Sequence, residues 1–292
     1  MKFGPLSLSS RSVTLAAVLV GMVSLAIGAH AALNKRSLEV AKALAVADTT
    51  GSIAVKPPRV ALVIGNGHYP DANGPLGQSI NDARALTTIL RRDGFDVITV
   101  EDANRDDMRR AVRRLESKIG PDTTALLFFS GFGIQSGRES YMIPVDARIW
   151  KEADVRRDGL SVEAVLGAMK TRSAKVKLAV IDASRRNPYE RRFRSYSHGL
   201  APITVPDNAL ILSSATPGKV VDESSGQYSL LMAELLKSLD TPDPDAGAVF
   251  SKTRIAVSRA TNGAQVPTVS SSLAQDVPFG STATMAARKA GG

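Results

Sequence analysis

The chain has 292 residues, 43% of them hydrophobic and 22% charged, which fits one α/β domain with an appendage and excludes a wholly disordered protein. It contains no cysteine, which excludes disulfides, thiolate metal sites and a cysteine nucleophile. Its net charge of +9 favours acidic partners or anionic surfaces and leaves the fold open.

Residues 1–31 are predicted to be a secretory signal peptide. Lys2 and Arg11 form a positive segment, an apolar run covers 13–28, and small residues surround His30 at a cleavage site near Ala31. The apolar run is short for a membrane span, so an uncleaved inner-membrane anchor is the alternative and the only predicted membrane contact. Both interpretations place the folded part outside the inner membrane of a bacterial-type cell, in the periplasm or secreted.

The rest of the chain divides into three predicted parts. Residues 32–58 are expected to be a linker with one short helix over 35–47, because small alanines recur at helical spacing before Pro57 and Pro58. A folded domain is expected over 59–279. Residues 280–292 are rich in Ser, Thr, Ala and Gly and are expected to be a disordered tail.

Apolar runs and amphipathic segments alternate regularly from residue 59 onward. The apolar runs predict buried strands at 59–65, 95–100, 124–130, 176–181 and 209–212. Helical spacing predicts helices near 79–94, 108–119, 162–169, 228–239 and 246–261. Ser79 or Asn81 is expected to cap the first of these helices.

This alternation predicts an α/β fold: a doubly wound, mostly parallel sheet flanked by helices on both faces. Ligands of such sheets bind beyond the carboxyl ends of the strands. Chemistry is therefore expected in the segments that follow Gly65, Ser130 and Ile181.

Several ordered motifs resemble those of the caspase-like cysteine peptidases, of the metacaspase or orthocaspase type found in bacteria. Members of that family end one strand in Ser-Gly-His-Gly and another in Asp-Ala-Cys-Arg. The matching segments here are VIGN (63–66), NDA (81–83), SGFG (130–133), YMIPVD (141–146), DASR (182–185), SATPG (214–218) and QVP (265–267). The resemblance implies a caspase-like domain over 59–279.

Both catalytic positions of the resembled family are substituted. Phe132 stands where the family has its general-base histidine, and Ser184 stands where it has its nucleophilic cysteine. The two are 52 residues apart, close to the roughly 50 residues between the histidine and cysteine of caspases. Phenylalanine has no proton acceptor, and a serine hydroxyl needs a positioned base. The chain is therefore predicted to be an inactive homologue rather than an enzyme.

Two further groups bear on residual activity. The backbone amides of Gly133 and Ser184 are expected to be able to form an oxyanion hole, which alone supports little catalysis. His68 follows the first strand and can line the cleft, so a Ser184–His68 hydrolase is an alternative, but the sequence shows no third group to orient this histidine.

Acidic and basic residues near the predicted cleft complete the candidate binding site. Asp82 and Asp182 match positions near the family's specificity pocket and before its nucleophile, although each also has a plain structural explanation in a helix start or a hydrogen bond. Arginines crowd the segment after Ser184 with only Glu190 opposing them. They hold an acidic peptide over the cleft, or they form a solvated basic loop: Arg185, Arg186, Arg191, Arg192 and Arg194.

The sequence therefore predicts an exported caspase-fold pseudo-peptidase that acts as a protein- or peptide-binding regulatory module. A residually active endopeptidase and a basic domain that binds envelope surfaces are the alternatives. No cofactor, metal or nucleic-acid partner is expected, because phosphate-loop and metal-ligand spacings are missing and the basic residues are scattered. The sequence leaves the oligomeric state open.

Overall fold

The computed structural model describes residues 57–70, 75–186, 189, 199–221, 226–240 and 245–279. All of them belong to one compact unit that begins at Pro57. The predicted signal peptide, the helix over 35–47 and the tail over 280–292 lie outside the described residues.

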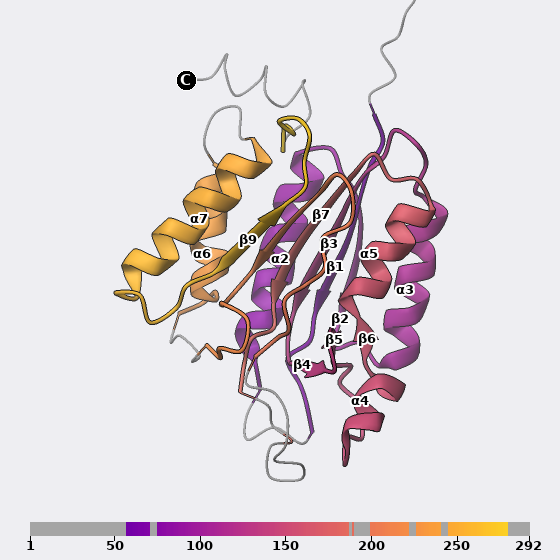
Figure 1. Ribbon diagram of the computed structural model, residues 1–292, viewed down its shortest axis with the longest axis vertical. Coiled ribbons are helices and arrows are strands. Elements are labelled where there is room, and N and C mark those ends of the chain that lie inside the picture. The colour runs from indigo at the N-terminus through magenta and orange to yellow at the C-terminus, as the bar shows by residue number, and fades with distance from the viewer. Residues whose placement is uncertain are drawn as a thin grey trace, which may run out of the picture. The chain divides into compact units, whose positions relative to one another are not determined.

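A six-stranded sheet forms the centre of this unit, in the order β2-β1-β3-β7-β8-β9 (Figure 1). The first five strands in that order are parallel, and β9 runs antiparallel to β8 at the edge. Every residue of β3 and β7 is buried, as their continuous apolar sequences predict. The strands are β1 (Arg59–Gly65), β2 (Asp96–Glu101), β3 (Thr124–Ser130), β7 (Val176–Asp182), β8 (Ala209–Ser213) and β9 (Thr268–Ser271).

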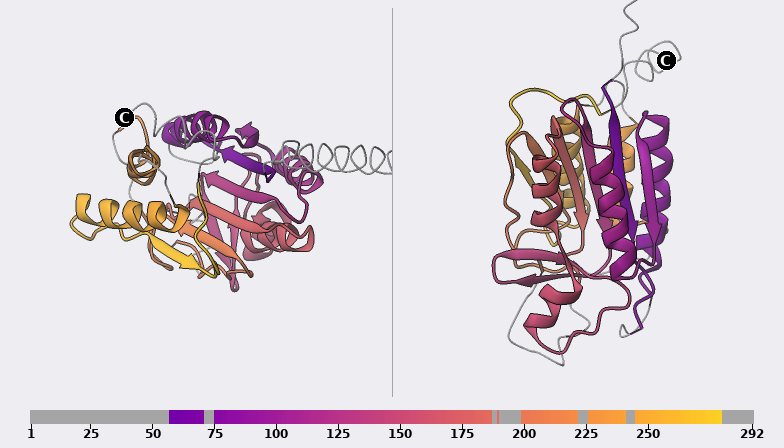
Figure 2. Two further views of the ribbon diagram at one scale, coloured as in Figure 1. Left: turned by 90° about the horizontal axis from the view of Figure 1, so that it is seen from above. Right: turned by 90° about the vertical axis from the view of Figure 1, so that its right-hand side faces the viewer.

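Helices cover both faces of the sheet (Figure 2). One apolar core lies between the sheet and α3 and α5, and a second lies between the other face and α2, α6 and α7. The predicted fold class, an α/β sandwich on a mostly parallel sheet, is confirmed. The helices are α2 (Gly77–Arg92), α3 (Arg105–Ser117), α5 (Val162–Thr171), α6 (Leu230–Leu239) and α7 (Ala246–Ala260).

A small second sheet, which the periodicity of the sequence did not indicate, lies beyond the end of β3. It consists of the antiparallel strands β4 (Gly133–Ser136), β5 (Glu139–Met142) and β6 (Leu160–Ser161), and α4 (Glu152–Asp158) precedes β6. Figure 1 shows these elements at one end of the main sheet. They carry a third apolar core, which surrounds the segment after β3.

The start of α2 differs from the prediction. The helix begins at Gly77 after Leu76, and no side chain caps it, so neither Ser79 nor Asn81 is its cap. Side-chain oxygens do cap four other helices, where each accepts a hydrogen bond from the backbone N–H three residues on. These capping residues are Asn104, Ser161, Ser229 and Asp245.

No helix within the described residues has both the length and the apolar character needed to cross a membrane. The predicted signal peptide or anchor at 13–28 is outside the part of the chain to which this finding applies.

Candidate functional site

The segments that follow β3 and β7 are held side by side at the carboxyl edge of the sheet. Ser130 pairs with Asp182 at the last register position of the two parallel strands. Beyond it, the Gly131 N–H donates to the Asp182 carbonyl at 3.2 Å, and the Gly133 N–H donates to the Ala183 carbonyl at 3.0 Å. These bonds place the segments that carry Phe132 and Ser184 next to each other, as the resemblance implies.

Phe132 lies in an apolar cluster and is only 6% exposed. Its ring meets the ring of Tyr69 edge-on, with 4.7 Å between the ring centroids. The Tyr69 hydroxyl accepts a hydrogen bond from the Phe132 N–H at 3.1 Å and donates one to the Ile143 carbonyl at 2.8 Å. The position that the resemblance assigns to the general base is thus occupied by an aromatic ring packed against a second one.

Tyr69 cannot replace the missing base. Burial raises the pKa of its hydroxyl far above the ordinary value, so the group stays protonated at neutral pH. Its hydrogen bonds with the backbone groups of Phe132 and Ile143 fix the ring against Phe132.

Ser184 is 2% exposed, and its backbone groups are engaged. Its N–H donates to the Ser214 hydroxyl at 3.4 Å, and its carbonyl accepts from the Val221 N–H at 2.6 Å. Among the described residues, no histidine or carboxylate is hydrogen bonded to the Ser184 hydroxyl. The described residues therefore provide no group that would activate this hydroxyl as a nucleophile.

The predicted oxyanion hole is not open in this structure. The Gly133 N–H is already used in its bond to the Ala183 carbonyl, so the expectation that it could bind an oxyanion is wrong for this arrangement. The contact is close: a Cβ at Gly133 would lie 2.8 Å from both the Cβ and the carbonyl oxygen of Ala183. Only glycine fits there, and its role is to join the two segments.

His68 has the orienting partner that the sequence did not reveal. Its Nδ1 lies 2.6 Å from an Asp102 carboxylate oxygen, and the other oxygen accepts the N–H groups of Gly67 and His68 at 2.8 and 2.9 Å. Partial burial would raise the pKa of Asp102, but these hydrogen bonds outweigh it and lower the pKa. The His68 side chain is 68% exposed, and none of its hydrogen bonds goes to Ser184.

Asp82, on α2, is wholly buried. One carboxylate oxygen accepts the Ser229 N–H at 3.0 Å, which links α2 to the start of α6, and the other has no partner among the described residues. Burial is the main cause that raises the pKa of Asp82 from 3.8 to about 7, and the charge of Asp182 adds to it. The group is thus partly protonated at neutral pH.

A cavity of about 110 Å³ is lined by Asp182 and Arg185, and also by Ser229, whose N–H binds Asp82. The Arg185 guanidinium lies 3.4 Å from the Asp182 carboxylate, and both side chains are 5% exposed. The lining residues are Gln78, Asp182, Arg185, Val221, Ser229, Leu230, Thr261 and Gln265. The predicted pocket residue Asp82 does not line it directly but holds Ser229, which does.

The predicted arginine cluster is thereby divided. Arg185 is buried against Asp182, so its assignment to an exposed basic loop is wrong. Arg186 is exposed. The other members, Arg191, Arg192 and Arg194, lie outside the described residues.

Sequence reasoning missed several residues of the site. Tyr69 and Asp102 stand in no recognisable spacing, and only the fold brings them to the carboxyl edge. Ser214 and Gln265 belong to the matching segments SATPG and QVP, but sequence reasoning assigned them no role at the site. Within the described residues, no three His, Asp or Glu side chains are grouped as a metal ion would require. No residue set there points to a cofactor.

Comparison with known proteins agrees with this architecture. Residues 58–278 match the family model described as "Caspase domain". The human mucosa-associated lymphoid tissue lymphoma translocation protein 1 is 29% identical over 133 residues, and its mouse homolog is 29% identical over 136. Each match covers 45% of this chain and 16% of the relative, so the chain spans a small part of the length of these proteins.

Proposed function

The chain belongs to the caspase-domain family, and on that premise we propose that it is a pseudo-peptidase: a domain that binds a protein or peptide segment at the family's cleft without cleaving it. The observation that carries the proposal is Phe132. Its ring is packed against Tyr69 where the general base of the family would stand.

The energetic cost of this substitution supports inactivity. Loss of a nucleophile–base pair costs on the order of a millionfold in turnover in a well-studied serine protease, or about 8 kcal/mol of barrier. Here Phe132 stands at the base position, no histidine or carboxylate among the described residues is hydrogen bonded to the Ser184 hydroxyl, and the Gly133 N–H is occupied. The three losses concern the same step, formation of the tetrahedral intermediate.

A retained cleft supports binding as the remaining activity. The cavity beside Ser184 keeps polar lining groups, including the Gln265 side chain and the Asp182–Arg185 pair. We place the bound segment over this cavity and give it an acidic character, because Arg186, Arg191, Arg192 and Arg194 follow directly in the sequence. Arg185 lines this cavity together with Asp182, with which it forms an ion pair.

We also propose export from a bacterial cell, with cleavage near Ala31 and action in the periplasm or outside the cell. The support is the pattern of residues 1–31: positive charges, an apolar run and small residues at its end. An uncleaved anchor would keep the same domain at the outer surface of the inner membrane.

A residually active endopeptidase is the second candidate, and one observation favours it. Asp102 orients His68 as an acidic partner orients a catalytic base, which leaves Nε2 of the ring for other contacts. Against it stand the exposure of His68 and the absence of a hydrogen bond to Ser184. The remaining candidate, non-selective binding to anionic surfaces, has the net charge as its support.

Binding of peptide libraries tests the proposal. We would pass acidic and basic libraries over immobilised mature protein at two salt concentrations, and identify retained peptides by mass spectrometry. The proposal expects selective retention of acidic peptides, weakened in the Arg186→Gln variant and unaffected by Lys252→Gln, which removes an exposed charge from α7. Retention of every polyanion alike would instead support surface binding, and retention of no peptide would refute the module.

A further inference from the structure

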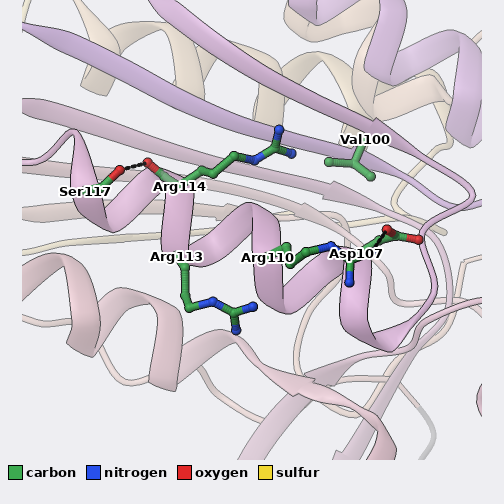
Figure 3. A pocket seen from close by; sticks show the side chains of 6 residues that line it. All are labelled: Val100, Asp107, Arg110, Arg113, Arg114 and Ser117. Atoms are coloured by element: carbon green, nitrogen blue, oxygen red, sulfur yellow. Dashed lines mark hydrogen bonds and ion pairs between the residues drawn. The ribbon is translucent and has the colours of Figure 1, made fainter.

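A basic groove lies on α3, far in the sequence from the cleft segments. It has a volume of about 510 Å³ and is bounded on one side by Val100 of β2. In Figure 3, Arg114 extends from α3 toward Val100, Arg110 lies beside Asp107, and Arg113 projects from the same helix. The lining residues are Val100, Asp107, Arg110, Arg113, Arg114 and Ser117.

Two of the three guanidinium groups have no acidic partner within the described part of the chain. Arg110 is paired with Asp107, one turn earlier on the helix. No carboxylate among the described residues pairs with Arg113 or Arg114, and both side chains are exposed. Nearby carboxylates are engaged elsewhere: Glu116 with Arg172, and Asp96 with Lys118. The groove therefore has an uncompensated positive charge.

The same groove adjoins an open sheet edge. β2 is the first strand in the sheet order and pairs only with β1 within the described residues. A strand at an edge leaves alternate backbone N–H and C=O groups on its outer side without a strand partner. The edge is partly accessible, since Val97, Thr99 and Val100 are each intermediate in exposure.

We propose that β2 and the arginines of α3 form a docking surface for an acidic peptide segment of another protein, which adds to the sheet as an extended strand. The backbone edge of β2 would pair with the segment, and its acidic side chains would enter the groove. This surface is separate from the cleft and does not depend on the proposed pseudo-peptidase function.

Spacing favours a strand over other acidic ligands. Arg110 and Arg114 are four residues apart on α3, which corresponds to about 6 Å along the helix axis. Side chains two residues apart on one face of a strand are separated by about 6.6 Å. Two acidic residues at alternate positions of an added strand therefore match this spacing: one can bind Arg114, and the other can reach Arg110, which would share its guanidinium with Asp107. A phosphate polymer or lipid headgroup could use the arginines but not the backbone edge.

A synthetic peptide of four Glu-Val repeats, labelled with fluorescein, tests the proposal by fluorescence anisotropy with the mature chain. Three comparison peptides separate the contributions: four Lys-Val repeats, an all-Glu peptide of equal charge, and a Glu-Val peptide with N-methyl groups on alternate amides. The variants are Arg113→Gln/Arg114→Gln, the charge-matched Lys252→Gln/Arg254→Gln on α7, and the cleft variant Arg186→Gln.

The proposal expects saturable binding of the Glu-Val peptide that weakens about tenfold in the Arg113→Gln/Arg114→Gln variant and remains unchanged in the α7 variant. Because the cleft is also proposed to bind acidic peptides, Arg186→Gln removes that contribution; a saturable component should persist in this variant and still weaken about tenfold when Arg113→Gln/Arg114→Gln are added. N-methylation should abolish binding, because it removes main-chain hydrogen bonds while leaving charge in place. Absence of saturable binding would overturn the proposal. So would equal weakening by the α7 variant, loss in Arg186→Gln alone, or equal binding of the N-methylated or all-Glu peptide.

Discussion

Phe132 contributes to stability through its contact with Tyr69 and the apolar cluster beyond the end of β3. We predict that Phe132→Ala lowers the free energy of unfolding by about 3–5 kcal/mol, because it leaves a cavity in that cluster. Phe132→Leu, the matched control, should cost less since it keeps most of the volume. Urea denaturation followed by circular dichroism measures both. A loss below about 1 kcal/mol for Phe132→Ala would contradict the packing role.

Asp82 should make stability depend on pH in a defined window. Its pKa is raised from 3.8 to about 7 by burial and by Asp182. The folded protein therefore holds a proton that the unfolded chain has released at intermediate pH, so this contribution is complete below pH ~4 and is lost as pH rises to ~7. Above pH ~7 the contribution of Asp82 to stability no longer changes with pH.

Asp82→Asn provides the measurement for this pH dependence. We predict that the stability of the native chain falls relative to Asp82→Asn by a few kcal/mol (about 4 at most) between pH 4 and 7. Asp106→Asn, which changes an exposed carboxylate at the start of α3, should track the native chain. A difference between native and Asp82→Asn proteins that stays flat over this range would show that the Asp82 pKa is not raised.

Single residues show what sequence reasoning can and cannot establish about the site. The 52-residue interval placed Phe132 and Ser184 on segments that the structure brings together. Arg185 was assigned to the exposed loop because a count of neighbouring charges cannot show that one side chain turns inward to Asp182. Asp102 was missed as the partner of His68, because 34 residues separate them and only the alignment of β1 with β2 makes them neighbours.

Gly133 joins the segments that follow β3 and β7. Gly167 in α5 serves as its control. Gly133→Ala places a Cβ within 2.8 Å of the Ala183 carbonyl oxygen and 2.7 Å of Leu200, whereas a Cβ at Gly167 on α5 meets nothing within 4 Å. We predict a loss of about 1–3 kcal/mol for Gly133→Ala and a gain of about 0.5–1 kcal/mol for Gly167→Ala. Thermal melts of the two variants should shift in opposite directions; shifts of the same sign would contradict the close approach.

The sequence predicts best the helices and strands that are long and that show a single periodicity, either that of a helix or that of a strand. The buried runs of β1, β3 and β7 were predicted within about one residue of their bounds, and the amphipathic α3 within about three. The strands β4, β5, β6 and β9 have two to four residues each, too few for a period to repeat. Their formation depends on contacts with distant segments, which sequence periodicity does not contain.

The whole molecule is expected to function outside the cytoplasm as a shortened chain. We predict that protein recovered from the periplasm of a bacterial host begins near Ala32, because the small residues before it form the cleavage site. Intact-mass measurement and N-terminal sequencing check this. Replacing Ala29 and Ala31 together with bulky residues should block processing. A full-length chain found only in the cytoplasm would contradict export.

The central claim is that this caspase-family chain does not cleave peptides, and turnover by the native protein tests it most directly. We would incubate purified mature protein and its Ser184→Ala variant with acidic and basic peptide libraries, with and without calcium, and quantify products by mass spectrometry. The account predicts no products above the buffer blank for either protein, since no base among the residues that the structure describes is bonded to the Ser184 hydroxyl. Cleavage by the native chain that disappears in Ser184→Ala would contradict it.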